Sequence, residues 1–194
     1  RLNKGLLTVE NIRLQEDRAF FQEGTIVLRG TMDLRKKTMN MQAHAVDANP
    51  AILTAFMQKP AVLTGSLNMT AQVEGPWDTL KGNGSVQIVQ GSLEDVAFDR
   101  ASADFVLNNN IITLSQVSAE QDVYKLTAAG RIPVDVFRAK ANRKNPNAQM
   151  DVKVDFNKAS LAVFGAHPSI DWGVGDAKGI VTITGTLDEP QLFG

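Results

Sequence analysis

The sequence contains no cysteine, and this absence excludes disulfide bonds and metal sites built from thiolates. Aromatic residues make up only 6% of the 194 residues, so the hydrophobic residues (43%) are mainly aliphatic. No run of about 18 apolar residues occurs, which excludes a transmembrane helix within the sequence. The formal net charge is -1, from 20 basic and 21 acidic residues. A nucleic-acid binder needs a positive surplus to displace counterions from phosphates, so we expect no nucleic-acid partner.

Motifs of catalysis are also missing from the sequence. His44 and His167 stand far apart, without the spacing of zinc ligands, and no nucleophile elbow of the GxSxG type occurs. Residues 82–84 begin like a dinucleotide-binding loop, but position 87 is Gln and no helical pattern follows. The carboxylates alternate with apolar residues, as the solvated face of a strand requires. We therefore predict a protein that is not an enzyme and holds neither a cofactor nor a metal.

Both ends of the sequence look like internal positions of a longer chain. The first residues run from Arg1 almost directly into a strand pattern, without the apolar core of a signal peptide. The last residues, 191–194, follow closely on a predicted turn. We expect the chain to be a segment of a longer protein.

Alternation of apolar and polar residues with a period of two dominates the sequence. Leu67 and Val73 fall on one face of a predicted strand, and Val152 and Val154 fall on one face of another. Glycines and short polar clusters such as residues 108–110 separate the strands, as antiparallel hairpins require. Strands are predicted near residues 5–14, 24–34, 39–46, 65–74, 84–93, 97–107, 110–118, 122–130, 149–156 and 178–187.

Two short segments interrupt this alternation. Residues 49–57 and residues 157–164 each begin with an asparagine that suits a helix cap, and each continues with apolar residues. We predict two short helices of one or two turns.

The early and late parts of the sequence repeat one pattern. Residues 7–12 resemble residues 112–117, and residues 30–34 match residues 130–134. Such self-similarity is typical of stacked arrays in which each unit buries its apolar face against its neighbours. We predict a first repeat over residues 1–82, a connecting hairpin over residues 83–111 and a second repeat over residues 112–194.

Glycines and turn prolines recur at the strand ends in residues 73–82 and 183–194, and a glycine-rich strand covers residues 82–93. In these features, and over nearly its whole length, the sequence resembles the TamB family, within the AsmA-like group of bacterial envelope proteins. The resemblance implies a curved β-groove in the bacterial periplasm, as part of a protein anchored in the inner membrane. It further implies phospholipid transport between the two membranes, or assembly of outer-membrane proteins together with a TamA-like outer-membrane barrel.

The alternation by itself fits either a closed sandwich or an open groove. With the repeat and the resemblance, we predict an all-β fold: an elongated, curved, mostly antiparallel sheet, shaped as a β-taco or half-barrel, with two short helices. Its apolar interior would bind phospholipid acyl chains or unfolded outer-membrane protein strands. The predicted groove residues are Ile26, Leu28, Met32, Met41, Leu67, Met69, Val73, Val86, Ile88, Phe105, Ile112, Leu114, Leu126, Val152, Val154, Phe156, Val181 and Ile183.

Two further interpretations concern the surface. The basic turns at residues 35–37 and 138–144 are either solvated hairpin tips or a groove rim that attracts anionic lipid head groups. The alternative function, from a different class, is a non-catalytic interaction module whose sheet edges pair with a strand of a partner protein.

Overall fold

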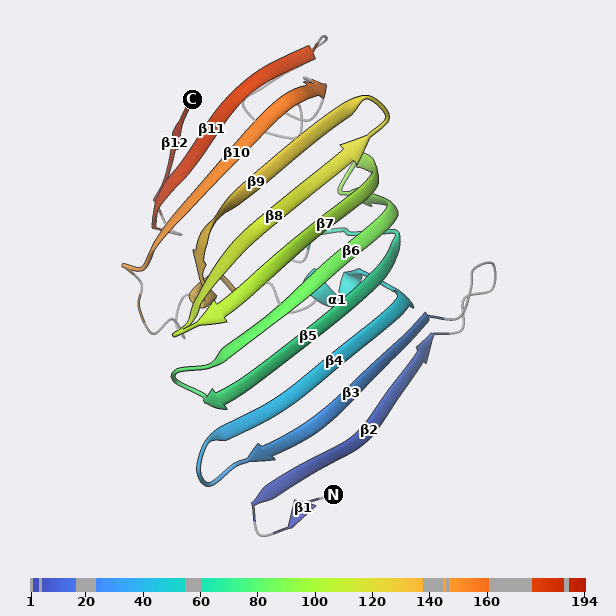
Figure 1. Cartoon of the computed structure of the whole chain (residues 1–194), viewed down its shortest axis with the longest axis vertical. Helices are drawn as coiled ribbons and strands as arrows, with labels where there is room; N and C mark the ends of the chain where they lie inside the picture. The colour runs from blue at the N-terminus through green and yellow to red at the C-terminus, as the bar shows by residue number, and fades with distance from the viewer. Residues whose placement is uncertain are drawn as a thin grey trace.

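In the computed structural model of the chain, the described residues are 2–3, 5–16, 24–54, 61–137, 145, 147–160, 176–186 and 189–194. They form one sheet of twelve strands, in which every strand is antiparallel to its neighbours in the sequence (Figure 1). The strands are β1 (Leu2–Asn3), β2 (Leu6–Glu16), β3 (Gly24–Asp33), β4 (Thr38–Ala48), β5 (Ser66–Pro76), β6 (Lys81–Leu93), β7 (Val96–Asn108), β8 (Ile111–Gln121), β9 (Tyr124–Pro133), β10 (Gln149–Ser160), β11 (Asp176–Thr186) and β12 (Pro190–Phe193). The predicted all-β class and the antiparallel arrangement are confirmed.

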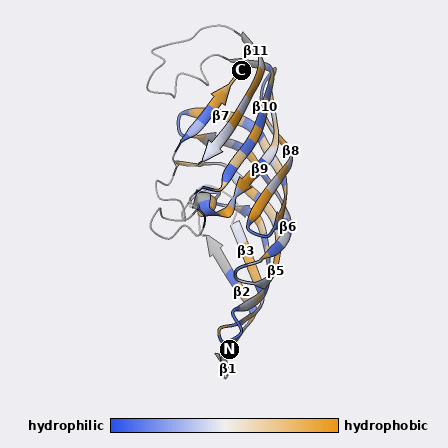
Figure 2. Cartoon of the chain, turned by 90° about the vertical axis from the view of Figure 1, so that its left-hand side faces the viewer, coloured by the Kyte–Doolittle hydropathy of each residue, from blue (hydrophilic) through white to orange (hydrophobic). Residues whose placement is uncertain are grey.

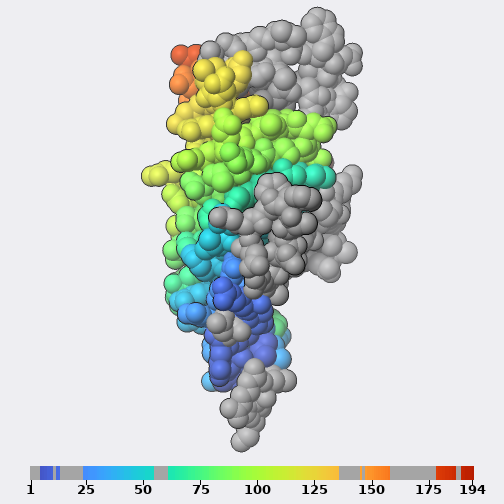
Figure 3. All heavy atoms as spheres, turned by 90° about the vertical axis from the view of Figure 1, so that its right-hand side faces the viewer, coloured from blue at the N-terminus to red at the C-terminus, as the bar shows by residue number. Residues whose placement is uncertain are grey.

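The sheet is open and curved. Among the described residues, β1 pairs with β2 alone and β12 pairs with β11 alone, so the two outer strands do not meet. Figure 2 shows the sheet bowed along its length, and Figure 3 shows successive parts of the chain stacked in sequence order along the long axis. The described strands form a single layer, so the closed sandwich is the wrong alternative.

Bulges keep the apolar side chains on one face along the whole length of a strand. In β4, Ala45 pairs with Met69 and Ala48 pairs with Leu67, so β4 carries one residue more than β5 between these pairs. The extra residue brings Ala48 back to the face that Ala45 occupies. Asp47 adopts a φ of 51° at this bulge, and its carboxylate accepts a hydrogen bond of 2.8 Å from the hydroxyl of Ser66.

Corresponding irregularities occur in the two predicted repeats. Val9 pairs with Gly30 just before the bulge of β2, and Leu114 pairs with Gly130 just before the bulge of β8. Strands β4 and β10 each contain a bulge near the C-terminal end of the strand. The division of the chain into two repeats and a connecting hairpin stays a prediction, to which these shared bulges add a structural parallel.

The prediction of two short helices is not confirmed. Helix α1 (Ala51–Thr54) is a single turn within the first predicted range, and the side chain of Asn49 accepts the backbone N–H of Ala51 at 3.0 Å, as a cap. In the second range, residues 157–160 belong to strand β10, in which residues 158–160 pair with β9 or β11, and residues 161–164 lie outside the described residues. A 3₁₀ turn, η1 (Val134–Phe137), follows β9.

The buried core is small and lies under α1. Ile52 and Leu53 of α1 pack against buried residues of β3 to β6, and Figure 1 shows α1 on the far side of β4 and β5. Small core size is expected for a single-layered sheet, because only such covering segments exclude water from one of its faces. The buried residues of this cluster are Ile26, Ala45, Ala48, Leu67 and Ile88.

Short turns along one rim of the sheet are hydrogen-bonded to one another. Alternate turns of a meander lie at the same rim, so these turns are neighbours in space. The side-chain amide of Asn110 also donates to the carbonyl oxygen of Asp78. The backbone bonds run from Leu34 N–H to Gly5 (2.8 Å), from Trp77 N–H to Lys37 (2.9 Å) and from Val134 N–H to Asn110 (2.8 Å).

Candidate apolar binding face

Cross-strand pairing places all eighteen predicted groove residues on one face of the sheet, which we call the apolar face. Residues directly opposite each other in an antiparallel pair share a face, and so do residues two apart on one strand. One continuous row, from β3 to β12, consists of Leu28, Ala43, Ala71, Gly84, Phe105, Leu114, Gly130, Val152, Ile183 and Leu192. A parallel row over β3 to β7 consists of Ile26, Ala45, Met69, Val86 and Ala103.

Most of the apolar face is only partly buried. Of the eighteen residues, Ile26, Leu67, Ile88 and Phe156 are buried, and the other fourteen are partly exposed. In a sandwich, side chains at such positions face a second sheet and are buried. Within the described residues, the aliphatic side chains of β7 to β11 have no such cover.

Glycine and aromatic residues are paired across strands on this face. A Cβ atom at Gly84 would lie 2.6 Å from the Cζ atom of Phe105, so the ring lies across the glycine of the neighbouring strand. Gly91 and Phe98 have the same relationship, with 2.7 Å to Cζ. The ring restores the apolar surface that the glycine lacks. Phe98 also packs against the buried cluster. The alternation of the sequence did not place Phe98 among the predicted groove residues.

The charged side chains that the structure describes on the strands lie mainly on the opposite face, and others lie at the turns. On the opposite face, which we call the polar face, Lys125 forms an ion pair of 2.7 Å with Glu120. The hydrogen bond and the charge of Lys125 lower the pKa of Glu120. Figure 2 shows hydrophilic and hydrophobic residues alternating along the strands, in agreement with this division.

The first basic turn is ordered by an aspartate. Asp33 accepts the backbone N–H groups of Lys36 and Arg35, each at 2.9 Å, and these hydrogen bonds, with the nearby positive charges, lower the pKa of Asp33. Arg35, Lys36 and Lys37 are exposed at the rim. The second basic turn, with Arg138, Lys140, Arg143 and Lys144, lies outside the described residues.

The structure brings no metal-binding group together among the residues it describes. His44 is exposed on the polar face of β4, and His167 lies outside the described residues. The described part of the chain contains no group of three or more histidine, aspartate or glutamate side chains that could hold a metal ion. None of the described helices is long and apolar enough to cross a membrane.

Comparisons with known proteins give no relative. No protein-family model, no curated protein and no solved structure matches this chain. The resemblance to the TamB family therefore stays a prediction from the sequence.

Proposed function

We propose that the apolar face lines a groove that carries phospholipid acyl chains. The observation that supports this proposal is the unbroken row of uncharged, apolar residues and glycines from Leu28 on β3 to Ile183 on β11, most of it partly exposed on a curved, single-layered sheet. Neighbouring strands lie about 4.8 Å apart, so eight steps from β3 to β11 span roughly 40 Å. A surface of that length accommodates a hydrocarbon tail along its whole path.

The energetics favour passive transfer along such a surface. Exposure of a methylene group to water costs about 0.8 kcal/mol, so a 16-carbon chain faces a barrier on the order of 12 kcal/mol in water. A continuous apolar face lowers this barrier without any chemical step. Methionine side chains at Met32, Met39, Met41 and Met69 adapt their shape to different tails, which suits a lining of low selectivity.

The cellular setting of the proposal comes from the sequence resemblance. We infer a segment of an inner-membrane-anchored protein in the bacterial periplasm, acting in phospholipid transport between inner and outer membranes or in outer-membrane protein assembly with a TamA-like barrel. The exposed basic turn at Arg35, Lys36 and Lys37 would then attract anionic lipid head groups at the rim.

Site-specific photocrosslinking tests the proposal. A photoreactive amino acid replaces Leu114 or Val152 on the apolar face, and in matched controls it replaces the adjacent Thr113 or Lys153, which are exposed on the polar face. After irradiation in bacterial cells, intact-mass spectrometry should find phospholipid adducts at the apolar-face positions 114 and 152 and not at the control positions 113 and 153. Equal labelling of both pairs, or no lipid adduct at either, would contradict the proposal.

Strand addition at a sheet edge is the second candidate function. Strand β12 pairs with β11 alone among the described residues, and Leu192 and Phe193 on β12 are 66% and 57% exposed. An edge with exposed apolar side chains is suited to pairing with a strand of another protein. Photocrosslinkers at these two positions should then yield protein adducts, whereas lipid adducts alone would favour the groove.

A further inference from the structure

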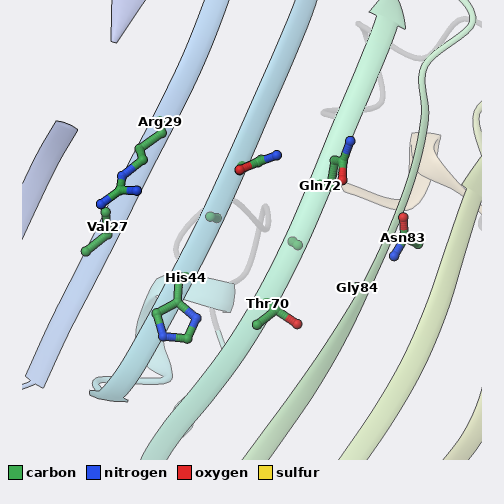
Figure 4. Close-up of a pocket in the computed structure, with 10 residues that line it drawn as sticks. Val27, Arg29, His44, Thr70, Gln72, Asn83 and Gly84 are labelled. Carbon is green, nitrogen blue, oxygen red and sulfur yellow. The ribbon is translucent and has the colours of Figure 1, made fainter. Parts of the chain in front are cut away.

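The polar face contains a hollow of about 430 Å³ over strands β3 to β6. Two rows of side chains flank it: Arg29, Gln42, Gln72 and Asn83 in one row, and Val27, His44 and Thr70 in the other. Between these rows lie Ala43 and Ala71, whose methyl groups belong to the apolar face, and Gly84, which has no side chain. The floor of the hollow is therefore backbone, and its walls are polar side chains together with Val27 (Figure 4).

The walls offer hydrogen-bond donors and no carboxylate. Arg29 supplies a guanidinium, His44 an imidazole, and the neighbouring residues supply amides and a hydroxyl. Among the described residues, the side chains of Arg29, Gln42 and His44 have no hydrogen-bonding or ionic partner. Figure 4 shows the Arg29 side chain lying along β3 toward Val27, with the His44 ring on the adjacent strand.

The residue that Arg29 faces on β4 differs in charge from the residues that several other basic side chains of the sheet face. Its partner on β4 is Gln42, an uncharged amide. Glu10 lies in the β2 bulge opposite Arg29 but forms no ion pair with it among the described residues. A guanidinium that no carboxylate engages keeps its capacity for a bidentate bond to an external oxyanion. By contrast, each of the following basic residues lies directly opposite a carboxylate: Lys81 opposite Glu74, Arg100 and Lys125 opposite Glu120, and Arg131 opposite Asp151.

We propose that this hollow binds a small oxyanion, a phosphate or carboxylate group held by Arg29 with donors from Gln42 and His44. An uncharged sugar fits the walls less well, because they contain no Trp, Tyr or Phe ring for stacking and no carboxylate to accept hydroxyl protons. The site lies on the face opposite the proposed lipid groove. It therefore does not depend on lipid transport.

Nuclear magnetic resonance titration of the 194-residue chain tests this site. Inorganic phosphate, glycerol 3-phosphate and succinate are added separately, and backbone amide shifts are followed. Saturable shifts at Gln42, His44, Thr70 and Gln72 with any of the three probes support the proposal. Tighter binding of glycerol 3-phosphate identifies a head-group-like ligand, equal binding of both phosphates identifies free phosphate, and binding of succinate alone identifies a carboxylate. The absence of saturable shifts with all three probes would overturn the proposal.

A matched pair of variants separates this site from general charge attraction. Arg29→Gln removes the guanidinium from the hollow and should weaken binding by about tenfold or more. Arg131→Gln is the control, because Arg131 is also exposed on the polar face but lies opposite Asp151. The control should keep the affinity of the unchanged chain. An equal loss in both variants would show attraction to net charge alone and would also overturn the proposal.

Discussion

The backbone N–H of Trp77 donates a hydrogen bond of 2.9 Å to the carbonyl oxygen of Lys37 and so joins the β5–β6 turn to the β3–β4 turn. The side chain of Asn110 extends the connection to the next turn by donating to the carbonyl oxygen of Asp78. Three successive hairpin tips at one rim are thereby held together.

Substitution of Asn110 tests the bonds between turns. Asn110 has a φ of 64°, so Asn110→Ala removes the amide donor and also replaces asparagine, which tolerates the left-handed conformation, by alanine, which tolerates it less well. We expect a loss of about 2 kcal/mol in the free energy of unfolding, measured with urea. Asn110→Gly tolerates the same backbone and should lose only the hydrogen bond, about 1 kcal/mol. Equal stability of the two variants would contradict the contribution of backbone strain.

Gly130 lies against the backbone of β10, which leaves no room for a side chain. A Cβ atom there would lie 2.6 Å from the Cα atom of Val152 and closer still to the carbonyl oxygen of Asp151. Gly130→Ala should therefore lower the free energy of unfolding by about 2 kcal/mol or more. Gly179→Ala on β11 meets nothing within 4 Å and should leave stability unchanged or raise it by up to about 1 kcal/mol. Urea titration of both variants gives the comparison, and a similar loss in each would count against this packing.

Gln116 marks the bulge of β8 with a φ of 52°. Glycine adopts this conformation without steric cost. Gln116→Gly should therefore leave the free energy of unfolding, measured by urea denaturation, unchanged or raise it by up to about 1 kcal/mol. The same substitution at Gln87, inside the regular part of β6, should lower it by about 1 kcal/mol. If Gln116→Gly proves as destabilising as Gln87→Gly, the left-handed bulge is not present.

Two leucines on the apolar face distinguish a covered region from an uncovered one. Leu67 is fully buried, and Leu67→Ala should cost about 2–5 kcal/mol of stability. Leu114 is partly exposed in the same face, so Leu114→Ala should cost less than about 2 kcal/mol. Chemical denaturation measures both values. A cost at Leu114 as large as that at Leu67 would indicate a second layer over β8.

Acid should remove the stabilising contributions of Asp33 and Glu120. Their pKa values lie below the ordinary values of 3.8 and 4.5, so the folded state binds fewer protons than the unfolded state. Each contribution is complete above the unfolded-state pKa and is lost as the pH falls through the lowered folded-state pKa. Carboxyl carbon resonances should show both low values, and Lys125→Met should raise the pKa of Glu120 without changing that of Asp33. A pKa of Glu120 that does not respond to this substitution would contradict the ion pair.

The apolar face could be predicted from the sequence because its signal is local. A period of two assigns every second residue to one face, and Leu67 or Val152 needs no distant partner for that assignment. All ten predicted strands are present, although their ends differ from the predicted ends by a few residues. Alternation alone did not decide between a sandwich and a single open sheet, because both have the same pattern along each strand.

The start of the second predicted helix shows where local signals failed. Asn157 has the residue type of a helix cap, but the segment pairs with β9 and β11, and this pairing outweighs its helical preference. Strand β12 was missed because four residues beginning with Pro190 are too few to show an alternation.

The polar hollow could not be predicted, because it depends on the registers of four strands together. Arg29, Gln72 and Asn83 are far apart in the sequence, and no spacing rule connects them. The left-handed residue Gln116 is another such case, since a glycine would have indicated the bulge and glutamine does not.

The meander order of the twelve strands has a consequence for biosynthesis. Each strand finds its partner in the segment made just before it, so a nascent chain can add hairpins one after another as translation proceeds. No strand has to wait for a distant segment to emerge, and the entropy lost in closing long loops is avoided. An architecture of this kind can gain length by acquiring extra hairpins while the earlier ones keep their neighbours.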